Sequence, residues 1–241
     1  MIKCDPVTGV CQLPELDNPN ETVAPAINSG STVHYIGDPM CSWCWGISPT
    51  ISAVEAFCQA KGIGFSITMG GLRPGGGDPW NDAFKDFLRN EWRHITQKTG
   101  QPFGFVLLEA KHFNYDTEPA CRAVATVKLL QVQHQLPVAI VLKFLAAIQH
   151  NFYVAGKDPK TANFYASICT DLELNFDEFR TLFNSPAGHQ AVQQDFARSR
   201  QLGVRSFPTL LLEHEGKIKP LAVGYTTAEQ VISQLQQVLT P

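Results

Sequence analysis

Two cysteines three positions apart, Cys41 and Cys44, constrain the fold of this 241-residue chain more than any other feature. They follow a short apolar run at residues 32–37, which predicts a strand, and they open a segment with helical spacing. The partial positive charge of a helix N-terminus stabilises a thiolate at the first cysteine. The second cysteine then stands where it can attack a mixed disulfide formed on the first. The sequence therefore predicts a strand–turn–helix unit in which Cys41 attacks and Cys44 resolves.

Half of a zinc site has the same cysteine spacing, and this is the alternative interpretation. A structural zinc ion usually needs a second cysteine or histidine pair at comparable spacing. The sequence contains no second C-x-x-C and no H-x-x-x-H. We therefore interpret the pair as a redox centre and expect no metal.

Composition excludes several classes of partner. The net charge is −3 and no block of Lys or Arg occurs, which argues against nucleic acid and against an anionic membrane surface. No apolar run approaches the length of a membrane span. Seven cysteines make a poor disulfide framework, and the N-terminus lacks the basic and apolar regions of a secretory signal. We therefore expect a protein that is either cytoplasmic or one whose signal has been removed, and Met1 favours the cytoplasm.

The first half of the α/β pattern runs from residue 32 to residue 69. Apolar positions predict a helix from Cys41 to about Lys61, kinked at Pro49 and ended by Gly62. Residues 63–69 alternate as a strand does, and a strand–helix–strand crossover favours parallel pairing.

The rest of the chain divides into a helical block and a second β unit. Glycines and a proline at residues 70–77 mark a boundary, and residues 80–202 show mostly helical spacing. Residues 209–212 and 219–223 predict a hairpin, followed by a helix that a capping box, Thr226-x-x-Glu229, opens. The predicted division is an N-terminal arm without a core of its own at 1–30, an α/β domain at 31–72 and 204–241, and an inserted helical domain at 73–203.

Pro208 stands at the mouth of the second β unit, where it cannot donate a hydrogen bond to a strand ladder. A cis Phe207–Pro208 bond in a tight turn is one explanation. A trans proline at a strand start is the other, and it is the commoner case.

Several motifs together resemble a known family. The order βαβ then ββα, with Cys-x-x-Cys opening the first helix, resembles the thioredoxin fold. Pro49, five residues after Cys44, matches the kink proline of that family, and Gly203-Val204-x-x-Phe207-Pro208-Thr209-Leu210 matches its cis-proline loop. The helical insertion resembles the DsbA-like branch. Residues 38–46 are most similar to the predicted bacterial protein-disulfide isomerases of that branch, and the resemblance covers residues 31–240.

This resemblance implies a specific site. Cys41 would be the exposed nucleophile and Cys44 its buried partner, with a cis Pro208 packed against both. The backbone of Phe207 would pair with an extended substrate by strand addition. Ser42 and Trp43 would also contact substrate; they replace the Pro-His of strongly oxidising DsbA proteins, which puts oxidising power in doubt. Trp43 and Trp45 form either an apolar lip for substrates or part of the core.

The implied function is a thiol–disulfide oxidoreductase or protein-disulfide isomerase that acts on protein or peptide thiols and disulfides. It would use a redox recycling partner, with glutathione as a candidate co-substrate and no other cofactor. Kappa-class glutathione transferases and hydroxychromene-carboxylate isomerases are the rival enzymes, although a single Ser works there in the place of Cys41. A chaperone-like binding module is the non-enzymatic rival.

The other five cysteines form two groups. Cys4 and Cys11 flank a turn-prone stretch, Asp-Pro-Val-Thr-Gly, and are either an auxiliary redox pair or two reduced thiols on a mobile arm. Cys58, Cys121 and Cys169 fall on apolar helical positions, which predicts buried packing residues.

Overall fold

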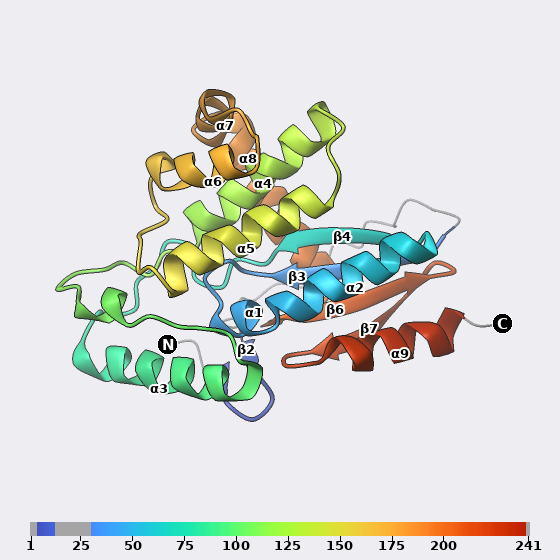
Figure 1. The fold of residues 1–241 in the computed structure, drawn as a ribbon, viewed down its shortest axis with the longest axis horizontal. Coiled ribbons are helices and arrows are strands. Elements are labelled where there is room, and N and C mark those ends of the chain that lie inside the picture. Colours follow the sequence, from blue (N-terminus) through green and yellow to red (C-terminus); the bar gives the residue numbers. More distant parts are fainter. Residues whose placement is uncertain (1–3, 13–29, 240–241) are drawn as a thin grey trace.

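A four-stranded sheet forms the centre of the computed structural model, which describes residues 4–12 and 30–239 (Figure 1). The strand order is β4-β3-β6-β7, with β3 parallel to β4 and antiparallel to β6, and with β6 antiparallel to β7. The parallel β3–β4 pair and the β6–β7 hairpin are the two halves that the sequence predicted. The strands are β3 (Thr32–Gly37), β4 (Gly64–Met69), β6 (Thr209–His214) and β7 (Lys217–Val223).

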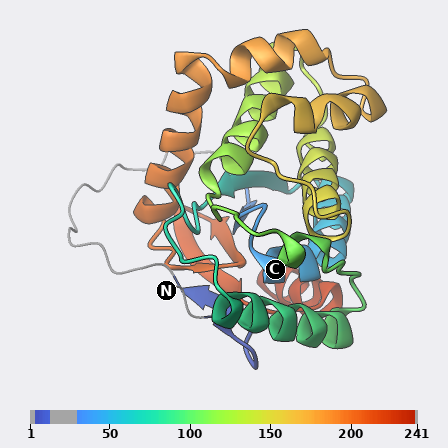
Figure 2. The same ribbon diagram turned by 90° about the vertical axis from the view of Figure 1, so that its left-hand side faces the viewer.

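Helices cover both faces of this sheet. Figure 2 shows α8 (Pro186–Gln201) on one side, with α2 (Ser48–Lys61) and α9 (Ala228–Leu239) on the other. The predicted kink is a break at Ile47, which separates α2 from the short α1 (Ser42–Gly46). Proline near the start of α2 explains the break, because its ring is tolerated only in the first turn of a helix.

The predicted helical block is helical over most of its length. Residues 100–117 are the main exception, since Gly100, Pro102 and Gly104 interrupt any regular helix there. Within the described residues, no helix combines the length and the apolar character that crossing a membrane requires. The remaining elements are α3 (Asp82–Thr99), α4 (Glu118–Gln133), α5 (Ala139–Tyr153), α6 (Ala166–Asp171), α7 (Phe176–Phe183) and the 3₁₀ turns η1 (Val106–Glu109) and η2 (Ala162–Tyr165).

One hydrophobic core joins the sheet to the helical block. Val33 and Tyr35 of β3 belong to the same buried cluster as Phe144 of α5 and Phe179 of α7. The sheet and the insertion therefore share their packing, and the division into separate domains at residues 73 and 203 stays a prediction.

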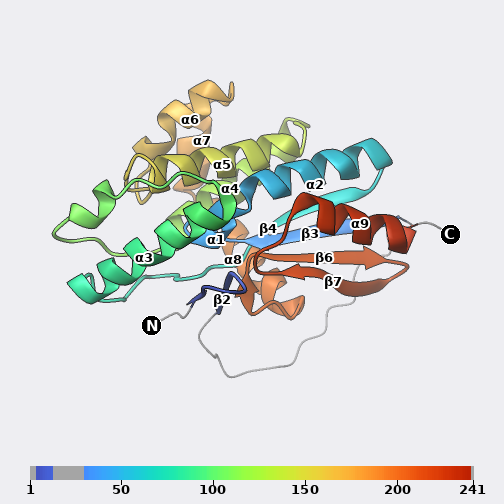
Figure 3. The ribbon, with the colours of Figure 1, turned by 60° about the horizontal axis from the view of Figure 1, so that its bottom comes forward.

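A second, smaller sheet brings the N-terminal residues to the molecule. The strands β1 (Cys4–Asp5), β2 (Val10–Gln12) and β5 (Ser206–Phe207) lie in the antiparallel order β1-β2-β5. Figure 3 shows this hairpin beside the end of the main sheet where α1 begins. Residues 4–12 are thus an integral hairpin, although the sequence pattern indicated only an arm. The rest of that predicted arm, residues 1–3 and 13–29, lies outside the described residues.

Candidate active site

Cys41 and Cys44 stand at the start of the first helical segment, as predicted. Cys41 is the N-cap residue of α1, and its backbone N–H donates to the Asp38 carbonyl oxygen at 3.1 Å. Both cysteines are free thiols, and both are fully buried. The expectation that Cys41 is exposed is therefore wrong for this structure.

Phe207 and Pro208 meet the cysteines from the second half of the fold. The Phe207–Pro208 peptide bond is cis, which confirms the conformation that the resemblance implied. The Cys41 thiol lies 3.9 Å from the Phe207 carbonyl oxygen, toward which it points as a donor. Two motifs separated by more than 160 residues thus form one site.

The backbone of Phe207 pairs with a strand of the chain itself. Cys11 of β2 is its partner across the antiparallel ladder, and Gln12 faces Ser206. The resemblance implied that an extended substrate would occupy this edge. In the structure residues 10–12 occupy it, and this explains why Cys41 is covered.

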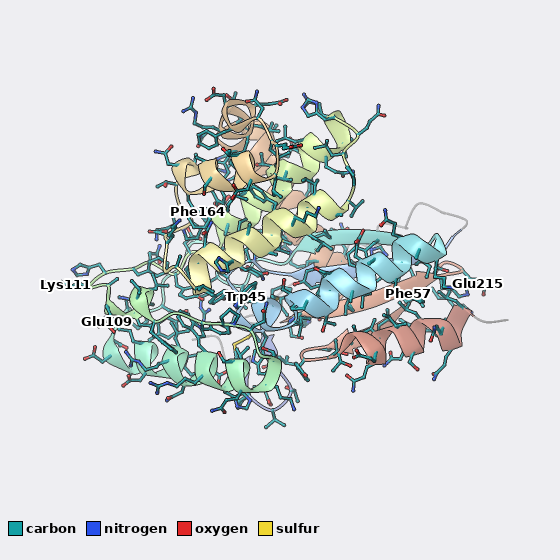
Figure 4. The ribbon with its side chains drawn as sticks, in the orientation of Figure 1. Trp45, Phe57, Glu109, Lys111, Phe164 and Glu215 are labelled. Atoms are coloured by element: carbon teal, nitrogen blue, oxygen red, sulfur yellow. A yellow bond between two sulfur atoms is a disulfide. The ribbon has the colours of Figure 1, made fainter. Side chains whose placement is uncertain are left out.

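The two tryptophans form no exposed lip in this structure. Trp43 is fully buried and makes edge contacts with His94 and Tyr225, each with ring centroids 5.9 Å apart. Trp45 is 6% exposed, and its indole N–H donates to the Pro102 carbonyl at 2.9 Å (Figure 4). The lip interpretation is thus wrong here, because the hairpin and Tyr225 cover Trp43 and the residues after α3 enclose Trp45.

Cys44 is fully buried in an apolar cluster, and two donor groups, the Asp38 backbone N–H and the Tyr35 hydroxyl, act on its sulfur and lower the pKa of the thiol. A side chain at Gly37 would collide with the Tyr35 hydroxyl at 2.4 Å, so glycine is needed for this close approach. Burial, together with the neighbouring Cys41, raises the pKa of the Cys44 thiol well above its usual value. Cys44 is therefore held as a thiol.

Asp38 anchors the loop that carries the cysteines. One carboxylate oxygen accepts from the Met40 N–H at 2.8 Å, and the other accepts from the Leu72 N–H at 2.6 Å and from the Cys121 thiol at 3.3 Å. Burial raises the pKa of Asp38, an effect that these hydrogen bonds oppose. The sequence alone predicts no role for Asp38 or Tyr35, because nothing in the local pattern shows that their side chains turn inward.

A disulfide joins Cys4 to Cys11 next to this site. Figure 4 shows it as a yellow bond beside α1. Both cysteines line a small cavity of about 10 Å³ that Ser42 also borders. The structure therefore contains a disulfide and a dithiol side by side, whereas the sequence left the state of Cys4 and Cys11 open.

The remaining cysteines are packing residues, as predicted. Cys58, Cys121 and Cys169 are all fully buried. Burial raises the pKa of the Cys58 thiol to about 11 and that of Cys169 to about 12, so neither is a ready nucleophile at neutral pH.

Comparisons with known proteins place this geometry in context. No family model and no curated protein matches the chain. A predicted protein disulfide isomerase from Nitrosomonas europaea is 31% identical, with a TM-score of 0.73 over 87% of this chain and 98% of that one. The cytosolic disulfide reductase DsbM from Pseudomonas aeruginosa is 26% identical, with a TM-score of 0.67 over 87% of this chain and 100% of that one. DsbM has also been solved with GSH. A 2-hydroxychromene-2-carboxylate isomerase, 12% identical with a TM-score of 0.52 over 86% of this chain and 94% of that one, shares the fold alone.

Proposed function

Since this chain belongs to the DsbA-like thiol–disulfide oxidoreductases of the thioredoxin fold, we propose that Cys41 and Cys44 exchange disulfides with protein or peptide substrates. The observation that carries the proposal is the meeting of Cys41 with the cis-proline loop. Cys41 begins α1, and the Phe207 carbonyl stands 3.9 Å from its sulfur. The thiol thus stands beside a backbone edge that pairs with an extended segment, β2 in this structure, and a substrate peptide would take the place of β2.

The reaction follows from the two positions of the cysteines. The Cys41 thiolate attacks one sulfur of a substrate disulfide, forming a mixed disulfide and releasing the other substrate sulfur as a thiolate, which takes up a proton. Cys44 then loses its proton and attacks the Cys41 sulfur, which frees the second substrate thiol and leaves a Cys41–Cys44 disulfide. Electrons move only between sulfurs, so the proposal needs no metal or organic cofactor.

The direction that we propose is reduction or isomerisation in a reducing compartment such as the cytoplasm. Ser42 and Trp43 carry no charge between the cysteines. DsbM, one of the proteins similar to this chain, is a cytosolic disulfide reductase. We therefore propose a thiol of the glutathione type as the recycling partner, which would return the Cys41–Cys44 disulfide to the dithiol.

Turnover of a fluorogenic peptide disulfide, with glutathione as the reductant, tests this proposal. We expect Cys41→Ala to lower the rate at least about 100-fold, because the attacking thiol is lost. We expect Cys44→Ala to accumulate a mixed disulfide between Cys41 and the peptide, visible by mass. Cys169→Ala, which removes a buried thiol in α6, serves as the control and should turn over at the rate of the unmodified protein.

Three outcomes would contradict the proposal, and each has a different meaning. Full activity in Cys41→Ala would point to a binding module instead of an enzyme. Tight glutathione binding with transfer chemistry but no disulfide turnover would favour the glutathione transferase or chromene isomerase type. A Cys41–Cys44 potential of about −120 mV, as in strong oxidants, would reverse the direction; a value of about −270 mV would support reduction.

A further inference from the structure

The N-terminal hairpin binds the active site as a substrate strand would. Its β2 strand forms the antiparallel ladder with Phe207, the residue whose carbonyl faces Cys41. The residue opposite Phe207 in this ladder is Cys11, which is one half of a disulfide. The hairpin therefore occupies this edge by strand addition and carries a disulfide-bonded cysteine at the residue that pairs with Phe207.

Contacts on both sides of the turn hold the hairpin in place. The Tyr225 N–H donates to the Thr8 carbonyl at 2.8 Å, and His94 Nε2 lies 2.7 Å from the Pro6 carbonyl oxygen. A Cβ at Gly9 would come within 2.9 Å of both Trp43 and Tyr225. The hairpin therefore packs closely against Trp43, His94 and Tyr225, and it is an integral part of the fold.

The sulfur atoms of the two pairs share one buried environment. Cys11, Cys41, Cys44 and Phe207 are fully buried members of a single apolar cluster, and Cys4 packs against it from a partly exposed position. Residues paired across an antiparallel ladder have Cα atoms about 4.5–5.5 Å apart, so Cys11 lies close to the residue that touches Cys41. Cys11 is therefore the inner sulfur of the hairpin disulfide and Cys4 the outer one.

Two ionisable side chains share a cavity with this disulfide. Arg73 and Glu91 line the same small cavity as Cys4 and Cys11. Arg73 is 6% exposed and Glu91 is 9% exposed, and each leaves one buried polar atom, Nη2 and Oε2 respectively, without a hydrogen-bond partner. An unpaired guanidinium nitrogen and an unpaired carboxyl oxygen are the groups that a newly formed thiolate would use, one for its charge and one for its proton.

We propose that the Cys4–Cys11 disulfide is an internal exchange partner of the Cys41–Cys44 dithiol. The inference deepens the proposed function, on which it rests, by naming a substrate that the chain carries itself. The Cys41 thiolate attacks the Cys11 sulfur, forming a Cys41–Cys11 bond and breaking the Cys4–Cys11 bond. Cys4 leaves as a thiolate beside Arg73 and is protonated from Glu91.

Cys44 completes the exchange. It attacks the Cys41 sulfur as a thiolate, forming the Cys41–Cys44 disulfide and displacing Cys11, which takes up the proton that Cys44 has lost and becomes a thiol. The two electrons of the active-site dithiol are then on the hairpin, which becomes a dithiol, and no outside oxidant or reductant takes part. The reverse exchange returns them, so the hairpin is an electron store attached to the site.

Site-resolved thiol mapping tests this exchange. The fully oxidised protein receives one equivalent of dithiothreitol, is quenched by acid and alkylation at intervals, and is cleaved after glutamate. Cleavage after Glu15, Glu21 and Glu55 puts Cys4 and Cys11 in one fragment and Cys41 and Cys44 in another. We expect reduction of the hairpin disulfide to follow reduction of Cys41–Cys44 at a rate independent of protein concentration.

Cys41→Ala should slow reduction of the hairpin disulfide at least about 100-fold, because an intramolecular thiol has an effective molarity far above that of the added reductant. Cys169→Ala, the matched control, should leave that rate unchanged. Hairpin reduction at the same rate in Cys41→Ala would overturn the inference.

A second variant keeps the test decisive if Cys41→Ala folds poorly. In Cys44→Ala the exchange stops at its midpoint, so fragments 1–15 and 22–55 should be joined by a Cys11–Cys41 disulfide, with Cys4 alkylated, in a protein that runs as a monomer. Fragments that stay separate would overturn the inference. Turnover of an added peptide disulfide, measured in parallel, distinguishes the two proposals: turnover without hairpin exchange removes only this one, and hairpin exchange without turnover removes only the proposed function.

Discussion

At Cys44 two donor groups, the Asp38 N–H and the Tyr35 hydroxyl, act on the sulfur. Burial raises the pKa of this thiol, and the two donors oppose that effect by stabilising the thiolate. Burial, with Cys44 beside it, also raises the pKa of Tyr35 well above 10, so its hydroxyl keeps its proton and remains a donor. The resolving step therefore depends on how well Tyr35 stabilises the charge that Cys44 acquires when it attacks.

Replacing this donor should affect the second half-reaction alone. We expect Tyr35→Phe to slow the resolution of a mixed disulfide at least about tenfold at neutral pH, since a hydrogen bond to a charged group contributes about 1.5–3 kcal/mol. The pH profile of resolution should move to higher pH, measured by stopped-flow after the mixed disulfide has formed. Tyr165→Phe is the control. It also removes a buried hydroxyl, which in this case donates to the Pro159 carbonyl, and it should leave the pH profile unchanged. An unshifted profile in Tyr35→Phe would show that Tyr35 only fills space.

Glu91 should make the stability of the protein depend on pH. Burial raises its pKa above the usual 4.5, an effect that His94 and the Trp43 side chain oppose and that Asp5 supports. As the pH rises from the usual value through the raised one, the unfolded chain loses this proton while the folded chain keeps it, so the folded state loses stability. Glu91→Gln removes this proton binding. Thermal melts between pH 4 and 8 should show the variant gaining stability relative to the unmodified protein as the pH rises, and a constant gap would contradict the assignment.

Among the elements, the β1–β2 hairpin determines access to the nucleophile. Gly9 has φ = +68°, in the left-handed region, and its position leaves no room for a Cβ against Trp43 and Tyr225. Cys41 is fully buried while β2 is paired with β5, so a reagent reaches it only when the hairpin opens.

We therefore expect Gly9→Ala to increase the alkylation rate of Cys41 on the order of tenfold or more. The left-handed backbone alone costs about 1–2 kcal/mol for alanine, and the population of opened hairpin rises accordingly. Gly216→Ala is the matched control, because Gly216 has φ = +71° in the β6–β7 turn with nothing within 4 Å of a Cβ. An equal effect of both variants would mean that global unfolding, and not the hairpin, exposes Cys41.

Helix ends illustrate how far the sequence determines these elements. The pattern Thr226-Thr227-Ala228-Glu229-Gln230 contains two overlapping capping boxes, and the predicted one pairs Thr226 with Glu229. The structure uses Thr227 with Gln230, whose N–H groups donate reciprocally to each other's side chains at 3.4 and 3.0 Å. The two capping boxes are offset by one residue, and the packing of α9 against the rest of the protein determines which of them forms.

The sequence predicted the features that depend on contiguous motifs, and it did not predict those that depend on contacts between distant segments. Cys41, Cys44 and Pro208 belong to contiguous motifs, so their places in the fold followed from the sequence and its family resemblance. The pairing of β2 with β5 joins residues more than 190 positions apart through strands of two and three residues. Strands this short are too short to show the apolar–polar alternation that predicts a strand. The pairing of β2 with β5, and with it the burial of Cys41, could therefore not be predicted.

For the whole molecule, the shared core predicts one cooperative unit. The sheet residues and the aromatic residues of the helical insertion lie in a single buried apolar cluster. Asp195 of α8 reinforces this connection, since its carboxylate accepts from the Met69 N–H of β4 at 3.0 Å and from Lys128 of α4 at 2.5 Å. Destabilising the insertion should therefore unfold the active site with it.

Phe179→Ala tests this coupling from within the insertion. Phe179 is fully buried against Phe144, Tyr165 and Phe183, and such truncations cost about 3–5 kcal/mol. Because each kcal/mol lowers the Tm of a chain of this size by about 2–4 °C, we expect a decrease of roughly 10 °C. The transition seen by circular dichroism, which reports the helices, and the transition seen by alkylation of Cys41, which reports the site, should shift together.

Val132→Ala is the control: this side chain is 72% exposed on α4, so the variant should change both transitions by little. A shift in circular dichroism alone would show that residues 73–203 unfold as a separate domain, because the protection of Cys41 would then depend on the sheet and the hairpin only.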